Sequence, residues 1–191
     1  MPSDTPPGKL IVFAAFKCIA QGSTADVLAQ LREHKDDTPY LVFNEQTGEL
    51  LDFDVHNRSG AVAHAASAEP PEETPRGVGR PKLGVVAREV TLLPRHWDWL
   101  NRQPGGASVA LRRLVQEASR VNADRDAVRA SREAAYRFMT AIAGALPGFE
   151  EATRALFAGE RERFEALIGS WPADLRIHLQ KLSAAGWSTT A

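Results

Sequence analysis

A single predicted strand in the middle of the chain constrains the fold more than any other feature. Residues 85–93 (VVAREVTLL) are rich in β-branched residues, and Pro94 suits the first position of a helix that follows directly. A lone strand leaves unpaired N–H and C=O groups at its edges, and two short helices cannot close a core over it. Antiparallel pairing with the same strand of a second copy would solve both problems.

Two helices are expected after this strand. The first covers residues 94–103 and ends at residues 104–106 (PGG), and the second covers residues 108–120. Helical spacing gives the second helix one apolar stripe, which consists of Leu111, Leu114, Val115 and Ala118. Large aromatic side chains beside an apolar residue are usually buried, so Trp97 and Trp99 are expected in the core.

Charge is segregated along the chain, although the net charge is only −1. Residues 1–75 carry five basic and 12 acidic side chains, residues 76–120 carry nine basic and three acidic ones, and residues 121–191 carry nine of each. A segment with a net charge of +6 predicts a polyanionic partner. This basic segment contains the predicted strand and the two helices after it.

The strand–helix–turn–helix unit of residues 85–120 resembles the ribbon-helix-helix repressors. The resemblance rests on residues 88–94 (REVTLLP), on Trp97 and Leu100, on the glycine turn and on residues 108–118. In that family the strands of two chains pair, and strand side chains enter a groove of the DNA. The resemblance therefore implies a homodimer through residues 85–120 that binds double-stranded DNA.

The resemblance also assigns roles to residues of the strand. Val90 and Leu92 take core positions, whereas Glu89 and Thr91 take groove positions. Arg88 lies near the end of the ribbon. The consecutive leucines at positions 92–93 break the alternation, so the opposite phase, with Arg88 facing outward, stays open.

The start of the second helix is the expected phosphate site. The resemblance implies that the backbone at Ala107 and Ser108 holds a phosphate, helped by the general affinity of helix starts for anions. Arg112, on the polar face of this helix, would add to that contact, and Arg95 in the first helix is a further expected DNA contact. A plain helix-turn-helix, in which the second helix reads the DNA, is an open alternative with the same target.

A segment of different composition precedes the strand. Residues 67–84 are rich in Ala, Glu, Pro and Gly, which predicts a flexible linker. At its basic end, residues 79–81 (GRP) resemble the core of an AT-hook, whose arginine enters the minor groove of A·T-rich DNA. The resemblance implies that Arg76, Arg80 and Lys82 form a DNA-binding arm beside the ribbon.

The outer regions complete an expected α+β fold. Residues 9–66 are predicted to form a small α+β module, in which Ser23 and Asp26 form a capping-box-like start of a helix. Its strands are expected within residues 9–21 and at residues 40–44 and 49–55. Residues 121–188 are predicted to be helical, with a new helix from Asn122 and about three short helices after residue 147.

Nearly the whole chain resembles an uncharacterised bacterial family of unknown function. The resemblance includes the run at residues 79–84 (GRPKLG), the run at residues 93–97 (LPRHW), the N-terminal module and the helical tail. It implies this order of modules and brings no activity with it.

No catalytic, cofactor or metal motif is visible. The chain has no Walker A loop, no GxSxG elbow and no glycine-rich dinucleotide turn, and its five histidines form no HxH or HExxH pattern. Asp52 and Asp54 alternate with apolar residues, as on a strand with one wet face. We expect no enzyme activity, no cofactor and no metal. The single cysteine, Cys18, lies in an apolar run and is expected to be an inert core thiol.

Together these features predict a dimeric DNA-binding protein, a bacterial transcriptional regulator. The lone cysteine fits a reducing cytoplasm, and no apolar run is long enough to span a membrane. The alternative is a protein-interaction scaffold or an antitoxin-like partner, in which the helices bind another protein and the basic segment only aids solubility. The sequence names no effector ligand.

Overall fold

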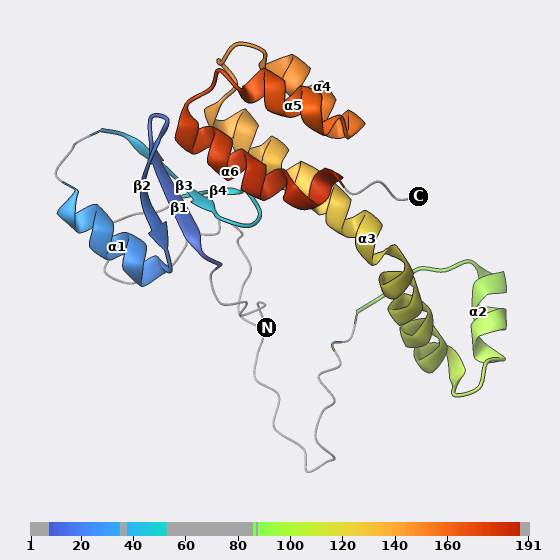
Figure 1. The fold of residues 1–191 in the computed structure, drawn as a ribbon. Helices are drawn as coiled ribbons and strands as arrows, with labels where there is room; N and C mark the ends of the chain where they lie inside the picture. The colour runs from blue at the N-terminus through green and yellow to red at the C-terminus, as the bar shows by residue number, and fades with distance from the viewer. Residues whose placement is uncertain (1–7, 35–37, 53–85, 87, 188–191) are drawn as a thin grey trace. The chain divides into compact units, whose positions relative to one another are not determined.

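The computed structural model describes residues 8–34, 38–52, 86 and 88–187 (Figure 1). Within these ranges the fold is α+β, as predicted, with a four-stranded antiparallel sheet near the N-terminus and six α-helices. The chain divides into two compact units. Unit 1 consists of Met1–His64 and Ala123–Ala191, and unit 2 consists of Ala65–Asn122.

The sheet of unit 1 has the strand order β2-β1-β3-β4. Its strands are β1 (Leu10–Ala14), β2 (Lys17–Gly22), β3 (Tyr40–Asn44) and β4 (Leu50–Leu51). The predicted strands at residues 9–21 and 40–44 are confirmed. The predicted strand 49–55 is short, because β4 pairs only at two positions and residues 53–55 lie outside the described residues.

Strand β1 is buried on both faces because helices cover the sheet on each side (Figure 1). Leu10 and Val12 pack with helix α1 (Thr24–Glu33), and Ile11 and Phe13 belong to the larger core on the opposite face. The capping box that starts α1 is confirmed: Ser23 Oγ accepts the Asp26 N–H, and the Asp26 carboxylate accepts the Ser23 N–H. These hydrogen bonds to Ser23 lower the pKa of Asp26.

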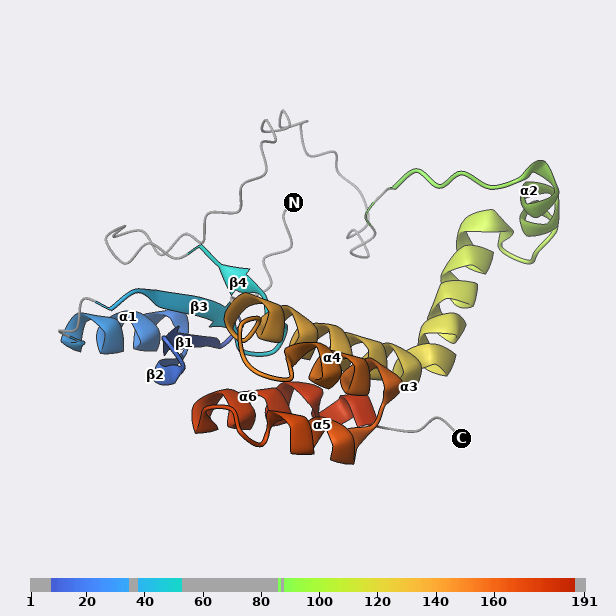
Figure 2. The same ribbon diagram turned by 90° about the horizontal axis from the view of Figure 1, so that it is seen from above.

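The remaining helices are α3 (Gly106–Ile142), α4 (Phe149–Ala158), α5 (Arg161–Ile168) and α6 (Ala173–Ser183), with a 3₁₀ turn η1 (Ala184–Trp187) after them. Figure 2 shows α4, α5 and α6 gathered beside the C-terminal part of α3. The three short helices after residue 147 are confirmed. None of the described helices is both long and apolar enough to cross a membrane.

The prediction of a new helix at Asn122 is wrong, because α3 passes through this position without a break. No glycine or proline follows Gly106 within the helix. Asn122 itself stays helical, and its side-chain Nδ2 donates to the carbonyl oxygen of Ala118, one turn earlier, at 2.8 Å. A polar residue that satisfies its side chain in this way does not end a helix.

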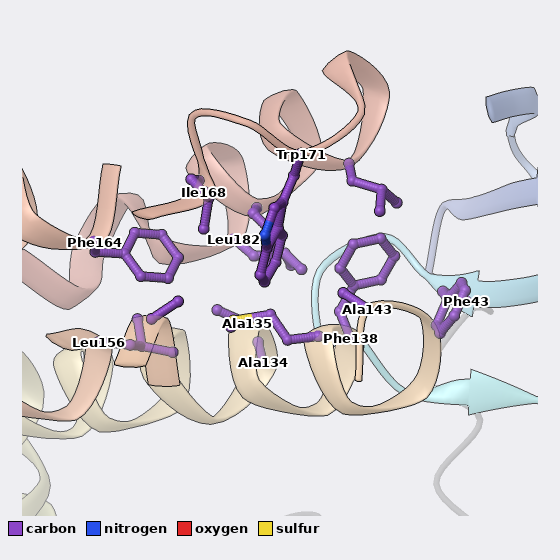
Figure 3. Close-up of a cluster of buried hydrophobic side chains, with 14 of the residues drawn as sticks. Phe43, Ala134, Ala135, Phe138, Ala143, Leu156, Phe164, Ile168, Trp171 and Leu182 are labelled. Carbon is purple, nitrogen blue, oxygen red and sulfur yellow. The ribbon is translucent and has the colours of Figure 1, made fainter. Parts of the chain in front are cut away.

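One aromatic core joins the sheet to the helical tail (Figure 3). Phe138 of α3 lies between the strands and the later helices, with its ring 5.3 Å from that of Phe13 and 4.8 Å from that of Phe43. Phe164, Ile168 and further residues of α5 and α6 continue this cluster. The predicted N-terminal module and the predicted helical tail therefore fold as parts of one unit.

The turn between β3 and β4 lies directly against α3. Gly48 has a φ of +64°, and a Cβ at this position would lie 2.1 Å from the carbonyl oxygen of Ala134. Arg137 supports the same contact, because its guanidinium donates to the carbonyl oxygen of Thr47 at 3.3 Å. Only glycine fits both the backbone conformation and the space.

Unit 2 contains α2 (Pro94–Asn101) and the first part of α3. Pro94 occupies the start of α2, as predicted, and Gly105 and Gly106 both have positive φ values at the turn into α3. Within the predicted strand 85–93, the described residues, Val86 and residues 88–93, have no regular secondary structure in the single chain. A strand requires a hydrogen-bonded neighbour, and the single chain supplies none in the described residues.

Candidate nucleic-acid interface

The sequence-predicted contacts fall into two groups. Arg76, Arg80 and Lys82, with the linker 67–84 to which they belong, lie outside the described residues. The others lie in unit 2, and the exposed ones are Arg88, Glu89, Thr91, Arg95, Ser108 and Arg112. Ala107 is half-buried. No hydrogen bond or ion pair among the described residues joins the segment before α2 to the start of α3.

The start of α3 keeps free donors. The Gly106 N–H donates to the carbonyl oxygen of Gln103 at 2.9 Å, whereas the N–H groups of Ala107 and Ser108 have no hydrogen-bond partner among the described residues. The first turn carries no acidic side chain that would neutralise the positive end of the helix. Arg112 lies along this turn, because its Nε donates to the carbonyl oxygen of Ser108 at 3.2 Å.

The arginines of unit 2 are largely free of acidic partners. Residues 86–122 carry six arginines against three acidic residues. Among the described arginines of unit 2, only Arg120 forms an ion pair, with Glu117 three residues earlier in the helix at 2.7 Å. Arg102 bonds only the carbonyl oxygen of Asp98. The positive charge is thus open to a partner from outside the unit.

Unit 2 also exposes large apolar side chains. Leu114 is 44 % exposed and Val115 is 62 % exposed, and both belong to the apolar stripe predicted for the helix. Trp99 was expected in the core and is 49 % exposed, whereas Trp97 is half-buried. The expectation is wrong for Trp99 because the described part of unit 2 has almost no interior: its buried apolar side chains are Leu100 and Ala110.

The residues before α2 do not decide the phase of the predicted ribbon. Val90 is exposed and Leu92 is half-buried, so neither is fully covered within one chain. Leu93, the other candidate for an inward position, is exposed too. Both phases of the strand therefore stay open.

A comparison with protein families matches nearly the whole chain to one family. Residues 9–183 match the model of a family described as an uncharacterized protein conserved in bacteria (DUF2239). The chain belongs to this family. No curated protein and no solved structure matches it. The predicted membership of an uncharacterised bacterial family is confirmed, while the ribbon-helix-helix resemblance stays a prediction for this DUF2239 member.

One polar cluster of this DUF2239 protein escaped the sequence analysis. Gln21, Asp174, His178 and Lys181 line a pocket in unit 1. The spacing of the last three along one helix was a usable signal, but their neighbours on β2 are more than 150 residues away in sequence. Among the described residues, no group of three or more His, Cys, Asp or Glu side chains is placed to hold a metal ion.

Proposed function

We propose that the chain is a DNA-binding transcriptional regulator that acts as a dimer through residues 85–120. The observation that carries the proposal is the composition of the surface of unit 2, where unpaired arginines and uncovered apolar side chains occur together. The arm with Arg76, Arg80 and Lys82 would extend the same positive surface toward the minor groove.

Dimerisation follows from the uncovered apolar side chains. The apolar stripe of Leu111, Leu114, Val115 and Ala118 has three- and four-residue spacing, so its members share one face of α3. Val121 continues the same face. Val121 is 63 % exposed, and the described part of unit 2 buries too little to cover this stripe. A second copy would bring an identical stripe to it, and would give residues 85–93 the strand partner that one chain lacks.

DNA binding follows from the charges. Arg113 and Arg120 lie two turns apart, on the side of α3 away from the apolar stripe. Arg112 lies beside the free N–H groups of Ala107 and Ser108. Guanidinium groups and a helix start are the protein groups that most often bind phosphate oxygens. A two-fold pair of such surfaces suits a DNA duplex.

The test is fluorescence polarisation with a labelled mixed-sequence duplex over a salt series. We expect binding at about 50 mM salt that weakens steeply as salt rises, because phosphate contacts release counterions. Arg112→Ala/Arg113→Ala removes four arginines from the dimer and should reduce the magnitude of the slope of log K against log salt by about four. The matched control is Arg161→Ala/Arg163→Ala in α5, where both arginines are ion-paired within unit 1, and it should leave the slope unchanged.

The dimer is tested by light scattering on the full chain. Val115→Asp should shift the mass toward the monomer, because it places a charge on the stripe at a position that is already exposed in one chain. Ile177→Asp, which changes an equally exposed side chain of unit 1, is the control. A native chain that is monomeric at every concentration would contradict the dimer, and absence of binding to any duplex at about 50 mM salt would contradict the function.

The exposed apolar stripe also favours a second candidate, a scaffold or antitoxin-like protein whose helices bind a different protein. In that case Val115→Asp abolishes capture of the partner, while the native chain remains a monomer that does not bind DNA. The two measurements above separate the candidates.

A further inference from the structure

A pocket of about 170 Å³ opens in unit 1 where the edge strand β2 meets α6. It is lined by Ile11, Cys18 and Gln21 from the strands and by Asp174, Ile177, His178 and Lys181 from α6. The α6 residues recur at three- and four-residue spacing and therefore share one helix face. The Cys18 N–H donates to Asp174 Oδ2 at 2.9 Å and joins the two walls.

His178 is the least satisfied polar side chain of this pocket. The residue is only 3 % exposed, and neither ring nitrogen has a hydrogen-bond partner among the described residues. Its ring packs against Phe138 and Phe13, with centroids 4.7 Å and 5.9 Å away. Because Nε2 is fully buried, Nδ1 is the nitrogen through which His178 can reach a ligand. When the ring proton is on Nε2, Nδ1 offers an acceptor lone pair that a donor group of a bound molecule would satisfy.

The other polar atoms at the pocket are mostly unused acceptors. Asp174 uses Oδ2 for the Cys18 N–H, which leaves Oδ1. Gln21 donates through Nε2 to Glu45 Oε1 at 2.5 Å, which leaves its Oε1. The one ammonium, that of Lys181, is already bound by the buried carboxylate of Glu45. The charge of Lys181 is thereby compensated, whereas Asp174 forms no ion pair among the described residues.

Charges of both signs act at the site. Burial and, after it, the negative charge of Asp174 raise the pKa of the Cys18 thiol. Burial and then the charge of Lys181 lower the pKa of His178 to about 4, so its imidazole is neutral at pH 7 and keeps an acceptor lone pair. Burial opposes ionisation of Glu45, but the hydrogen bond and charge of Lys181 outweigh it and lower the pKa of Glu45.

We propose that this pocket binds a small primary ammonium ligand, with Asp174 Oδ1, His178 Nδ1 and Gln21 Oε1 as acceptors. Because Lys181 is paired with Glu45, the carboxylate of Asp174 is the charge at the pocket that has no ion-pair partner among the described residues. Ile11 and Ile177 supply apolar walls for a short alkyl chain. The volume suits about six heavy atoms, since a cavity of about 150 Å³ holds benzene. The proposal concerns unit 1 alone and holds whether or not unit 2 binds DNA.

The experiment compares three probes of equal size on the full native chain by amide NMR at constant ionic strength. The probes are n-butylammonium, 1-butanol and tetramethylammonium, which has the charge but no N–H donor. We expect saturable shifts of the Cys18 and Asp174 amides with n-butylammonium, and binding about tenfold weaker with the other two, because 1-butanol lacks the positive charge and tetramethylammonium lacks an N–H donor. Equal binding of 1-butanol and n-butylammonium, or no shift with any probe, would overturn the proposal.

Asp174→Asn and Asp124→Asn form the matched pair of variants. Asp174→Asn keeps an oxygen acceptor for the Cys18 N–H but removes the charge, and should abolish n-butylammonium binding. Asp124→Asn removes an exposed carboxylate of α3 and should not change it. A second readout is the titration of Cys18, the sole thiol: a bound cation should lower its pKa, and bound 1-butanol should not. If Asp174→Asn fails to fold, the three-probe comparison alone decides.

Discussion

Units 1 and 2 contain similar helices but differ in what those helices bury. Unit 1 encloses a continuous aromatic core around Phe138, and most of its surface arginines have an acidic partner within one helical turn. In the described part of unit 2 the buried apolar side chains are Leu100 and Ala110, and Arg88, Arg95 and Arg113 have no ion pair. The difference indicates that unit 1 encloses its own core, while the described part of unit 2 leaves apolar side chains and charges uncovered, which is the basis of the proposal that it binds other molecules.

The largest expected effect lies in the core of unit 1. Phe138→Ala should lower the free energy of unfolding by about 4 kcal/mol, because it leaves a cavity among rings that cannot close over it. Tyr136→Ala, two residues away on the exposed side of the same helix, should lose about 1 kcal/mol through its ring contact with Phe157. Urea denaturation measures both. Equal losses of unfolding free energy in the two variants would contradict the assignment of Phe138 to a tightly packed core.

Acid should weaken unit 1 through His178. Its pKa is about 4 in the folded chain against 6.5 ordinarily, so the unfolded chain binds an extra proton between these values. The free energy of unfolding should therefore fall by about 2 kcal/mol as the pH drops from 6.5 to 4. Urea titrations at each pH measure this loss.

His178→Gln should flatten that pH dependence, and His34→Gln, at an exposed position, should not. The groups around His178 are Lys181 and Asp174 on its own helix, Cys18 on β2, and Glu45 after β3. Glu45 has a pKa lowered from 4.5, so its contribution to the free energy of unfolding is lost below about pH 4.5. Most of the loss caused by His178 occurs above that pH. An unchanged slope in His178→Gln would contradict the assignment.

A smaller expected effect is that hydrogen exchange in unit 2, but not in unit 1, depends on protein concentration. If unit 2 is completed by a second copy, hydrogen exchange of the α2 amides should slow about threefold for each tenfold rise in protein concentration. The amides of α6 should not respond, because their partners lie within unit 1. Exchange measured by mass spectrometry at two concentrations tests this. Equal behaviour of both helices would remove the main difference between the units.

The smallest effect concerns surface charge. Arg161→Ala breaks an exposed ion pair with Glu165 and should cost at most about 0.5 kcal/mol of unfolding free energy. Arg113→Ala has no ion pair to break among the described residues and should leave the same quantity unchanged. Urea denaturation of the two variants side by side is the measurement. A larger loss at Arg113 would assign it a structural role in place of the proposed phosphate contact.

Local signals in the sequence predicted most of unit 1. The capping box at Ser23, the strands at residues 9–21 and 40–44 and the short helices after residue 147 depend on patterns within a few residues, so pattern and propensity suffice to find them. The shared core was not predicted, since the contact of Phe43 with Phe138 spans nearly a hundred residues. The pocket at His178 escaped for the same reason.

In unit 2 the sequence identified the helices and the turn but misjudged burial. An apolar stripe on a helix indicates that something covers it, and it does not say whether the cover comes from the same chain. Leu114 and Val115 show the consequence, since both are exposed in one chain. The strand predicted at residues 85–93 stays a prediction, because its expected partner is a second copy and a single chain shows no strand at Val86 and residues 88–93.

The continuity of α3 has a practical consequence for dissecting the protein. The border between the units, between Asn122 and Ala123, falls inside a hydrogen-bonded helix of 37 residues. A gene fragment that stops or starts there would leave up to about four backbone carbonyls or N–H groups without partners on the new end. Expression of either half alone should therefore include added turns of α3 and an engineered cap, or the fragment will fray at a place where the intact protein has no loop.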